Sequence, residues 1–151
     1  MTAEPSQETS RIVVGLDGSA SSFEALSWAA RQAVLTGSSL EIVMTWEWPS
    51  SYGWAVPVPD DFDPEADVQR TLDTAVAGVR AEHPGLRVDR RVISGHPAPI
   101  LVEASEGADL LVVGSRGHGK FAELFLGSVS EHVVAHATCP VVVVRTKGAH
   151  A

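Results

Sequence analysis

The chain has 151 residues, of which 44% are hydrophobic and 20% charged, and its formal net charge is −8. This is the length of one domain with a sizeable core. The acidic balance argues against nucleic-acid binding, which needs a basic stripe. The single cysteine, Cys139, excludes an internal disulfide framework and a cysteine-rich zinc site, and we expect it to serve in packing.

The hydropathy and the start of the chain predict a cytoplasmic protein without a membrane anchor. No apolar run approaches the roughly 18 residues of a membrane span. The polar start M-T-A-E-P-S-Q-E-T-S has neither the basic nor the apolar region of a secretion signal. We expect residues 1–10 to be a disordered lead-in, residues 11–146 to form a single domain, and residues 147–151 to be a tail.

Apolar runs and helical patterns alternate along the chain. Five strands are predicted, at 12–16, 40–45, 86–93, 110–113 and 141–144. The third alternates apolar and polar residues, which is typical of an edge strand. Four helices are predicted, over 21–37, 64–82, 100–106 and from Gly127-Ser128 onward.

Residues with known preferences for helix ends mark two of these helices. Ser21 and Glu24 fit a capping box at the start of the first, and Gly37 fits its stop. Asp63 and Pro64 fit the N-cap and the first residue of the second helix. The stretch from Trp46 to Asp63, between the second strand and this helix, is rich in tryptophan and proline. We predict a long loop there that covers a sheet edge or forms a lid.

Strand–helix alternation with short turns predicts a parallel sheet with right-handed crossovers. Ligands in such sheets lie at the carboxyl ends of the strands. The turns after the first, second and fourth strands, at Asp17, Thr45 and Gly114, all open at that edge.

A glycine-rich loop follows the fourth strand and returns to a helix start. We expect Gly114 and Gly117 to adopt positive φ and to let the backbone approach a ligand. The helix start at Gly127 favours an anion. The basic residues of the loop, Arg116, His118 and Lys120, suit a phosphate in an otherwise acidic chain, and Ser128 and Ser130 add hydroxyl donors.

Other interpretations of this region stay open. Ser128 and Glu131 also fit a capping box that needs no ligand, and the loop can be merely solvated. The spacing from Gly114 to Lys120 matches a Walker A loop, but Phe121 stands where a Ser or Thr should bind magnesium. His132 and His136 share a helix face, without the glutamate of a zinc protease motif, so a helix surface is expected there.

The residues around this loop resemble the universal stress protein family in its small single-domain form. The family's nucleotide motif is G-x-x-G, nine residues, then G-S or G-T. It is complete here in Gly114, Gly117 and Gly127-Ser128. The opening V-V-G-L-D-G-S is also similar, and the resemblance covers residues 11–145.

The resemblance implies a flavodoxin-like α/β fold, with a five-stranded parallel sheet of order 3-2-1-4-5, that binds ATP with Mg²⁺. Asp17 would lie beside the nucleotide, the backbone at Thr45 would meet adenine, and Val113 and Gly114 would line the base and ribose. The residues implied in nucleotide binding are Gly15, Asp17, Thr45, Val113, Gly114, Arg116, Gly117, Gly127, Ser128, Val129 and Ser130. His118, among the nine variable residues, joins them by its charge alone.

The resemblance also implies a homodimer that pairs through the last strand, Val141 to Val144, and a further protein partner that the sequence does not identify. No nucleophile stands beside a recognisable base. We therefore expect an ATP-binding regulatory protein of the stress response. The alternatives are a slow ATPase or phosphate-transferring enzyme that uses Asp17, and a dimeric interaction module that binds no nucleotide.

Overall fold

The computed structural model describes residues 10–47, 60–61, 63–115 and 126–146. Its strands are β1 (Arg11–Leu16), β2 (Ser39–Trp46), β3 (Val88–Ser94), β4 (Leu110–Gly114) and β5 (Val141–Val144). Its helices are α1 (Ala20–Thr36), α2 (Pro64–Glu82), α3 (Pro97–Ala104) and α4 (Ser128–His136). None of the helices in these ranges is long and apolar enough to span a membrane.

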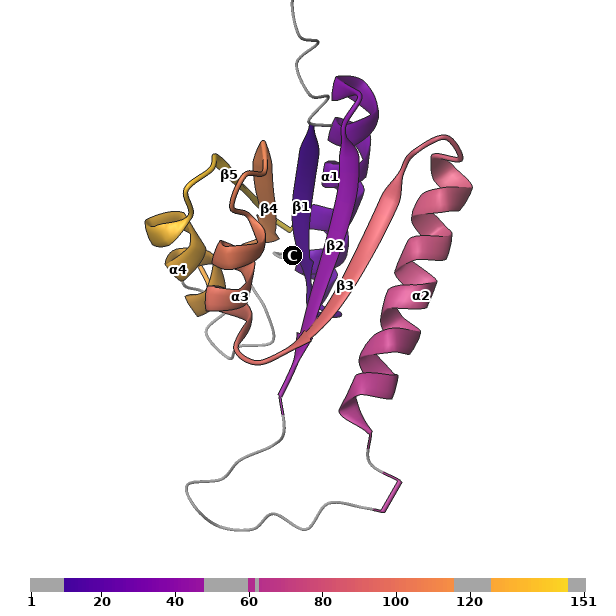
Figure 1. Cartoon of the computed structure of the whole chain (residues 1–151), viewed down its shortest axis with the longest axis vertical. Helices are drawn as coiled ribbons and strands as arrows, with labels where there is room; N and C mark the ends of the chain where they lie inside the picture. Colours follow the sequence, from indigo (N-terminus) through magenta and orange to yellow (C-terminus); the bar gives the residue numbers. More distant parts are fainter. Residues whose placement is uncertain (1–9, 48–59, 62, 116–125, 147–151) are drawn as a thin grey trace, which may run out of the picture.

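The strands form one parallel sheet of order β3-β2-β1-β4-β5 (Figure 1). The predicted flavodoxin-like order is therefore confirmed. β1 is central, with β2 on one side and β4 on the other, so the direction of chain winding reverses beside it. This is the topological switch point of the sheet, where ligands of such folds bind. The predicted edge position of the third strand is also correct.

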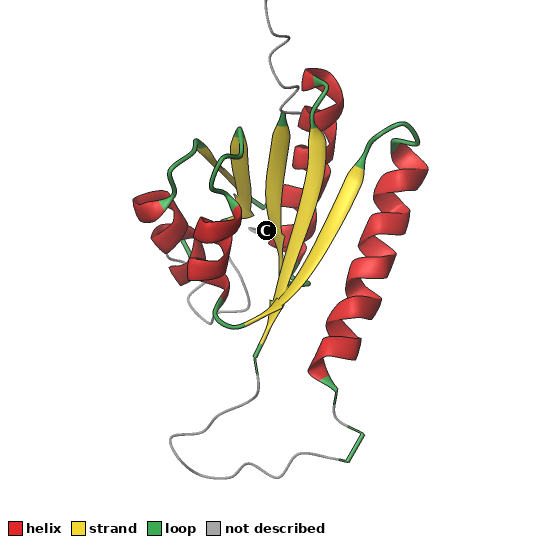
Figure 2. Ribbon diagram, viewed as in Figure 1, coloured by secondary structure: helices red, strands yellow, loops and turns green. Residues whose placement is uncertain are grey.

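Helices cover both faces of the sheet (Figure 2). Side chains alternate between the faces along each strand. In β1, Val14 packs in the cluster under α1 and α2, whereas Val13 packs in the cluster under α3 and α4. Cys139 is a free, partly buried thiol packed against the second cluster, as expected.

Local preferences explain most of the helix ends. Gly37 caps α1 in the left-handed conformation with φ 67°, as predicted. Asp63 caps α2 by accepting a hydrogen bond from the amide of Ala66, and Pro64 is the first helical residue. The predicted capping box of Ser21 and Glu24 is wrong. Ser19 is the N-cap, and its hydroxyl accepts from the amide of Ser22.

The start of α3 also differs from the prediction. α3 begins at Pro97 rather than at residue 100, because proline suits the first helical position. α4 begins at Ser128 behind Gly127, as predicted, but Gly127 makes no side-chain cap. Ser128 therefore lies inside the helix, and the predicted capping box with Glu131 does not form.

Candidate functional site

The candidate site lies at the carboxyl edge of the sheet, which is the lower edge in Figure 1. Three segments meet there: the turn from β1 into α1, the end of β4, and the start of α4. β1 and β4 are hydrogen-bonded neighbours, so their ends are adjacent. The described site residues thus gather at the switch point from segments more than a hundred residues apart in the chain.

Asp17 connects the end of β1 to the start of α1. Its carboxylate Oδ1 accepts a hydrogen bond from the amide of Ser19 at 2.8 Å, and its own amide donates to Ser22 Oγ at 3.2 Å. The side chain is exposed. The geometry therefore fixes the carboxylate beside the first turn of α1 and leaves it open to solvent at the strand edge.

Gly114 is a packing residue in this structure. The expected positive φ is absent, since Gly114 belongs to β4 and its backbone is not left-handed. A Cβ at this position would lie 2.8 and 2.9 Å from the backbone carbon and oxygen of Ser21. The absence of a side chain therefore lets the end of β4 approach the first turn of α1.

Gly15 has a comparable role on the other face of the sheet. A Cβ there would lie 2.8 Å from a terminal methyl carbon of Leu101, in α3. Its position in the middle of β1, paired with Val43, gives it a part in helix packing. Any contact of Gly15 with a ligand would have to use its backbone.

Ser115 joins three elements behind the site. Its amide donates to the carbonyl of Val144 at 2.9 Å, and its carbonyl accepts from the amide of Gly127 at 2.7 Å. These bonds hold the start of α4 against the ends of β4 and β5. The Ser115 hydroxyl is buried and has no hydrogen-bond partner among the described residues. Sequence reasoning missed this residue, although it lies inside the glycine motif.

The first turn of α4 presents backbone donors. Gly127 provides no side-chain cap, and the amides of the first helical residues have no intrahelical acceptor. Ser128 is exposed and Val129 is partly buried against the α3–α4 cluster. Ser130 is buried, and its hydroxyl donates to the carbonyls of Gly127 and Ser115 at 3.0 and 3.3 Å. Of the two predicted hydroxyl donors, Ser130 is thus engaged and Ser128 faces solvent.

Thr45 and Val113 occupy different environments at the same edge. The pairing of β2 with β1 ends at Met44. Thr45, the next residue of β2, therefore extends beyond the end of β1 and is partly exposed. Val113 is 4% exposed, and its side chain belongs to the core. Only the backbone of Val113 can therefore face a ligand.

A contact between a carboxylate and an imidazole that the sequence did not reveal lies beyond Thr45. Oε1 of Glu47, just after β2, is 3.4 Å from Nδ1 of His96, the N-cap of α3. The amide of Gly95 donates to the carbonyl of Trp46 at 2.8 Å. These contacts join the ends of β2 and β3, at Trp46 and Ser94, which lie 48 residues apart and share no motif.

Several predicted features lie outside the described residues. They are Arg116, Gly117, His118 and Lys120, the remainder of the Walker-like spacing, and most of the aromatic stretch between β2 and α2.

The two histidines of α4 lie on the helix surface, as expected. The rings of His132 and His136 stack with centroids 4.3 Å apart, and both side chains are exposed. The described ranges contain no group of three or more His, Cys, Asp or Glu residues that could hold a metal ion.

Comparison with known proteins gives consistent matches. The model of the universal stress protein family matches residues 8–145. A universal stress protein of Thermus aquaticus is 39% identical over 144 residues, which cover 89% of this chain and 97% of that protein. A universal stress protein of Mycobacterium tuberculosis is 34% identical over 145 residues, which cover 95% of this chain and 50% of that protein. The chain spans about half the length of this and other mycobacterial relatives.

A solved structure agrees over a similar extent. A universal stress protein in complex with cAMP has a TM-score of 0.71 and 29% sequence identity to this chain. The alignment covers 92% of this chain and 98% of that one.

Proposed function

Because the chain belongs to the universal stress protein family, we propose that it binds ATP at the carboxyl edge of its sheet and acts as a nucleotide-dependent regulator of the stress response. The observation that carries this proposal is the start of α4. Its first turn has no side-chain cap, and Ser115 ties it to the ends of β4 and β5 at the switch point. The cAMP complex of a relative supports an adenine nucleotide as the ligand class.

The phosphates of ATP would meet the first turn of α4. The free amides there, the positive end of the helix dipole and the exposed Ser128 hydroxyl are donors suited to an anion. Close to this turn, the buried hydroxyl of Ser115 is a further donor, and it has no acceptor among the described residues. Adenine would lie toward Thr45, and Gly15, Val113 and Gly114 would contribute through their backbones.

Mg²⁺ would accompany the triphosphate. This ion is commonly held by one or two carboxylates together with phosphate oxygens and water. Asp17 is the carboxylate at the junction of β1 and α1, and its solvent-exposed side chain suits such a role. The ion would supply charge neutralisation of the phosphates.

The first experiment identifies the ligand. The protein is purified without added nucleotide and denatured, and the released compounds are identified by mass spectrometry. Magnesium-ATP is then titrated calorimetrically into the nucleotide-free protein. Stoichiometric ATP, or saturable binding of added ATP, supports the proposal. No released nucleotide together with no binding heat would refute it and favour the interaction module without nucleotide.

A charge variant tests the place of binding. Ser128→Asp adds a negative charge to the first turn of α4, where acidic residues favour the helix, so stability should be kept. ATP affinity should fall by about tenfold or more, because the added carboxylate lies close to the phosphates. Thr74→Asp adds the same charge on the exposed surface of α2 and should leave affinity unchanged. Equal affinities of the two variants would refute phosphate binding at α4.

Hydrolysis is the second candidate activity, and Asp17 is the residue that could orient a metal ion or water. Asp17→Asn keeps an oxygen acceptor for the Ser19 amide and removes the charge. Turnover at about 1 s⁻¹ or more that this variant abolishes would establish an enzyme. Absent or slower turnover supports the regulator.

The proposed homodimer forms through the free edge of β5. Its four valines are all partly exposed, and within the described chain β5 pairs only with β4. An unpaired apolar edge favours pairing with another strand. The carbonyl of Pro140 accepts from the amide of Leu111 in β4, and that of Val144 accepts from the amide of Ser115, just after β4. Because backbone groups alternate along a strand, those of Val141 and Val143 face outward.

This alternation gives a matched pair of variants for the dimer. Val143→Pro removes an outward amide and leaves the pairing with β4 intact. It should give a folded monomer in light scattering after size-exclusion chromatography. Val142→Pro removes an inward amide and should destabilise the fold. A dimeric Val143→Pro variant would refute pairing through β5.

The protein would act in the cytoplasm, where ATP is available. Binding of ATP would change its contacts with a protein partner. Cell fractionation tests the location. A partner that binds equally with and without saturating ATP would contradict the regulatory part of the proposal.

A further inference from the structure

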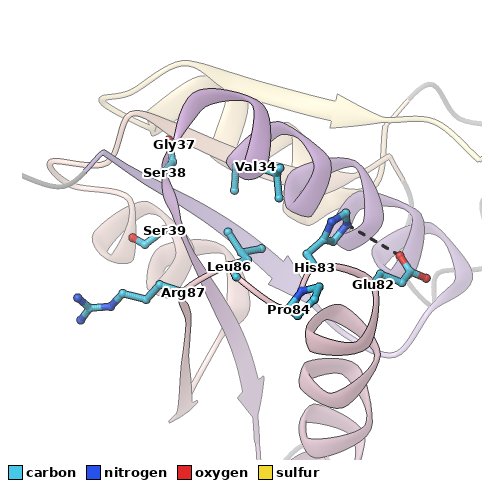
Figure 3. Close-up of a pocket in the computed structure, with 11 residues that line it drawn as sticks. Val34, Gly37, Ser38, Ser39, Glu82, His83, Pro84, Leu86 and Arg87 are labelled. Carbon is cyan, nitrogen blue, oxygen red and sulfur yellow. Dashed lines mark ion pairs between the residues drawn. The ribbon is translucent and has the colours of Figure 1, made fainter.

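A second concave site lies at the edge of the sheet opposite to the candidate nucleotide site. There the C-terminal ends of α1 and α2 and the turn after α2 line an open cavity of about 600 Å³ (Figure 3). Ser39, the first residue of β2, is part of the lining, which places the cavity at the amino edge. Pockets for small molecules have volumes of roughly 300–1,000 Å³, so the cavity can admit one.

The walls of this cavity are partly apolar. Val34 of α1 lines it and is 50% exposed, and Pro84 and Leu86 line it from the turn after α2. Figure 3 shows Val34 and Leu86 pointing toward the same space between the two elements. Covering these side chains would release water, so a ligand with an apolar body is favoured.

The ends of both helices give the cavity a negative potential. The C-terminus of a helix carries a partial negative charge, and α1 has no basic residue in its last turn. Pro84 follows α2 and has no N–H, so it cannot donate to the carbonyl of Arg80, the next acceptor in the helix. Glu82, a lining residue whose side chain is 75% exposed, adds a full negative charge at the solvent side of the cavity.

The neighbouring cations do not cancel this potential inside the cavity. Arg87 is itself a lining residue, but it pairs with Asp89 at 3.3 Å, and its side chain is 73% exposed and extends away from Val34 and Leu86 in Figure 3. Arg80 lies in the last turn of α2 and is not among the lining residues. Nε2 of His83 lies 4.0 Å from Oε2 of Glu82.

We propose that this cavity binds a small organic cation, a primary amine that carries an apolar group. The ammonium would interact with Glu82 and the helix-end carbonyls, and the apolar group would lie between Val34 and Leu86. Such a site is separate from the nucleotide site by the length of the strands.

The first test compares two probes that share an aromatic body and differ in charge. 2-Phenylethylamine and phenylacetate are each titrated into the full chain, and backbone amide shifts are followed by NMR. The amine should give saturable shifts at Gly37, His83 and Leu86. Phenylacetate should bind at least about tenfold more weakly than the amine, because its carboxylate is repelled by Glu82 and the negative helix ends. Equal affinity of the two probes, or amine shifts confined to other residues, would overturn the proposal.

Two pairs of variants test the two halves of the site. Glu82→Gln should weaken amine binding about two- to fivefold, the range of an exposed ion pair. Glu65→Gln, in the first turn of the same helix, should leave it unchanged. Val34→Trp should fill the cavity and abolish the shifts. Val134→Trp replaces a valine of α4 that is equally 50% exposed and should leave them intact.

The control variants define the results that would contradict the proposal. The inference is overturned if Glu65→Gln lowers affinity as much as Glu82→Gln does, or if Val34→Trp binds the amine as the unmodified chain does. None of these measurements involves ATP, so their failure would leave the nucleotide proposal standing.

Discussion

The contact between β4 and α1 makes Gly114→Ala a sharp test of the structure. The added Cβ would lie 2.8 and 2.9 Å from backbone atoms of Ser21, where ordinary contacts begin at 3.4 Å. The strand end and the helix turn must therefore separate by about half an ångström. Overpacking of this kind costs about 1–3 kcal/mol. The smaller conformational entropy of the unfolded alanine chain offsets about 0.4–1 kcal/mol of this cost.

The net expectation is a loss of about 1–2 kcal/mol in the free energy of unfolding. For a chain of this size the midpoint of thermal unfolding should fall by about 2–8 °C. Urea denaturation, followed by tryptophan fluorescence, should show a lower midpoint at an unchanged slope. An unchanged midpoint would refute the close approach of β4 to the first turn of α1.

Another glycine provides the matched control. Gly78 is exposed within α2, and a Cβ there would meet nothing within 4 Å. Gly78→Ala should therefore stabilise the chain by about 0.5–1 kcal/mol, because alanine favours a helix interior. The same substitution would thus shift stability in opposite directions at the two positions. Equal shifts in the same direction would show that backbone propensity, and not the contact with Ser21, governs Gly114.

Three further substitutions, one of them with a control variant, test the contacts of single residues by urea denaturation. Ser19→Ala should cost about 1 kcal/mol, because it removes the cap of α1; no loss would contradict the assigned cap. Glu41 is buried between Arg11 and Arg91 at 2.5 and 3.3 Å. Glu41→Gln should cost about 2 kcal/mol, whereas Asp73→Asn, in an exposed pair, should cost less than about 1 kcal/mol. Ser115→Ala should raise stability by about 1 kcal/mol, since it removes a buried hydroxyl without a described partner; a loss would reveal a partner.

Elements that depend on local chemistry were predictable from the sequence. The start of α2 follows from Asp63 and Pro64, and the end of α1 follows from Gly37. The buried strands follow from short apolar runs. The sheet order came from the resemblance, because alternation alone allows several orders of parallel strands.

The start of α1 shows where local reasoning fails. The segment holds three serines within four residues, Ser19, Ser21 and Ser22, and each is an acceptable cap by composition. The choice depends on a tertiary contact, because Ser21 is 5% exposed and packs against the end of β4. A residue held there cannot also serve as the half-exposed cap.

Contacts between residues that are distant in sequence could not be predicted either. Arg11 bonds Glu41, 30 residues away, and the carbonyls of Ala104 and Glu106 at the end of α3. The cavity at the amino edge combines residues 33–39 with residues 82–87. No spacing rule connects such segments, since the sheet order alone brings them together.

The glycine motif combines two physical demands that the structure separates. Gly114 is needed where two backbones pack, so its substitution should act first on stability. The start of α4 has exposed Ser128 and uncapped amides, so a charge placed there should act first on affinity. If phosphate binding were the sole reason for the motif, both substitutions would lower affinity at constant stability. Measuring the two properties on Gly114→Ala and Ser128→Asp therefore distinguishes a packing glycine from a ligand-binding turn within one motif.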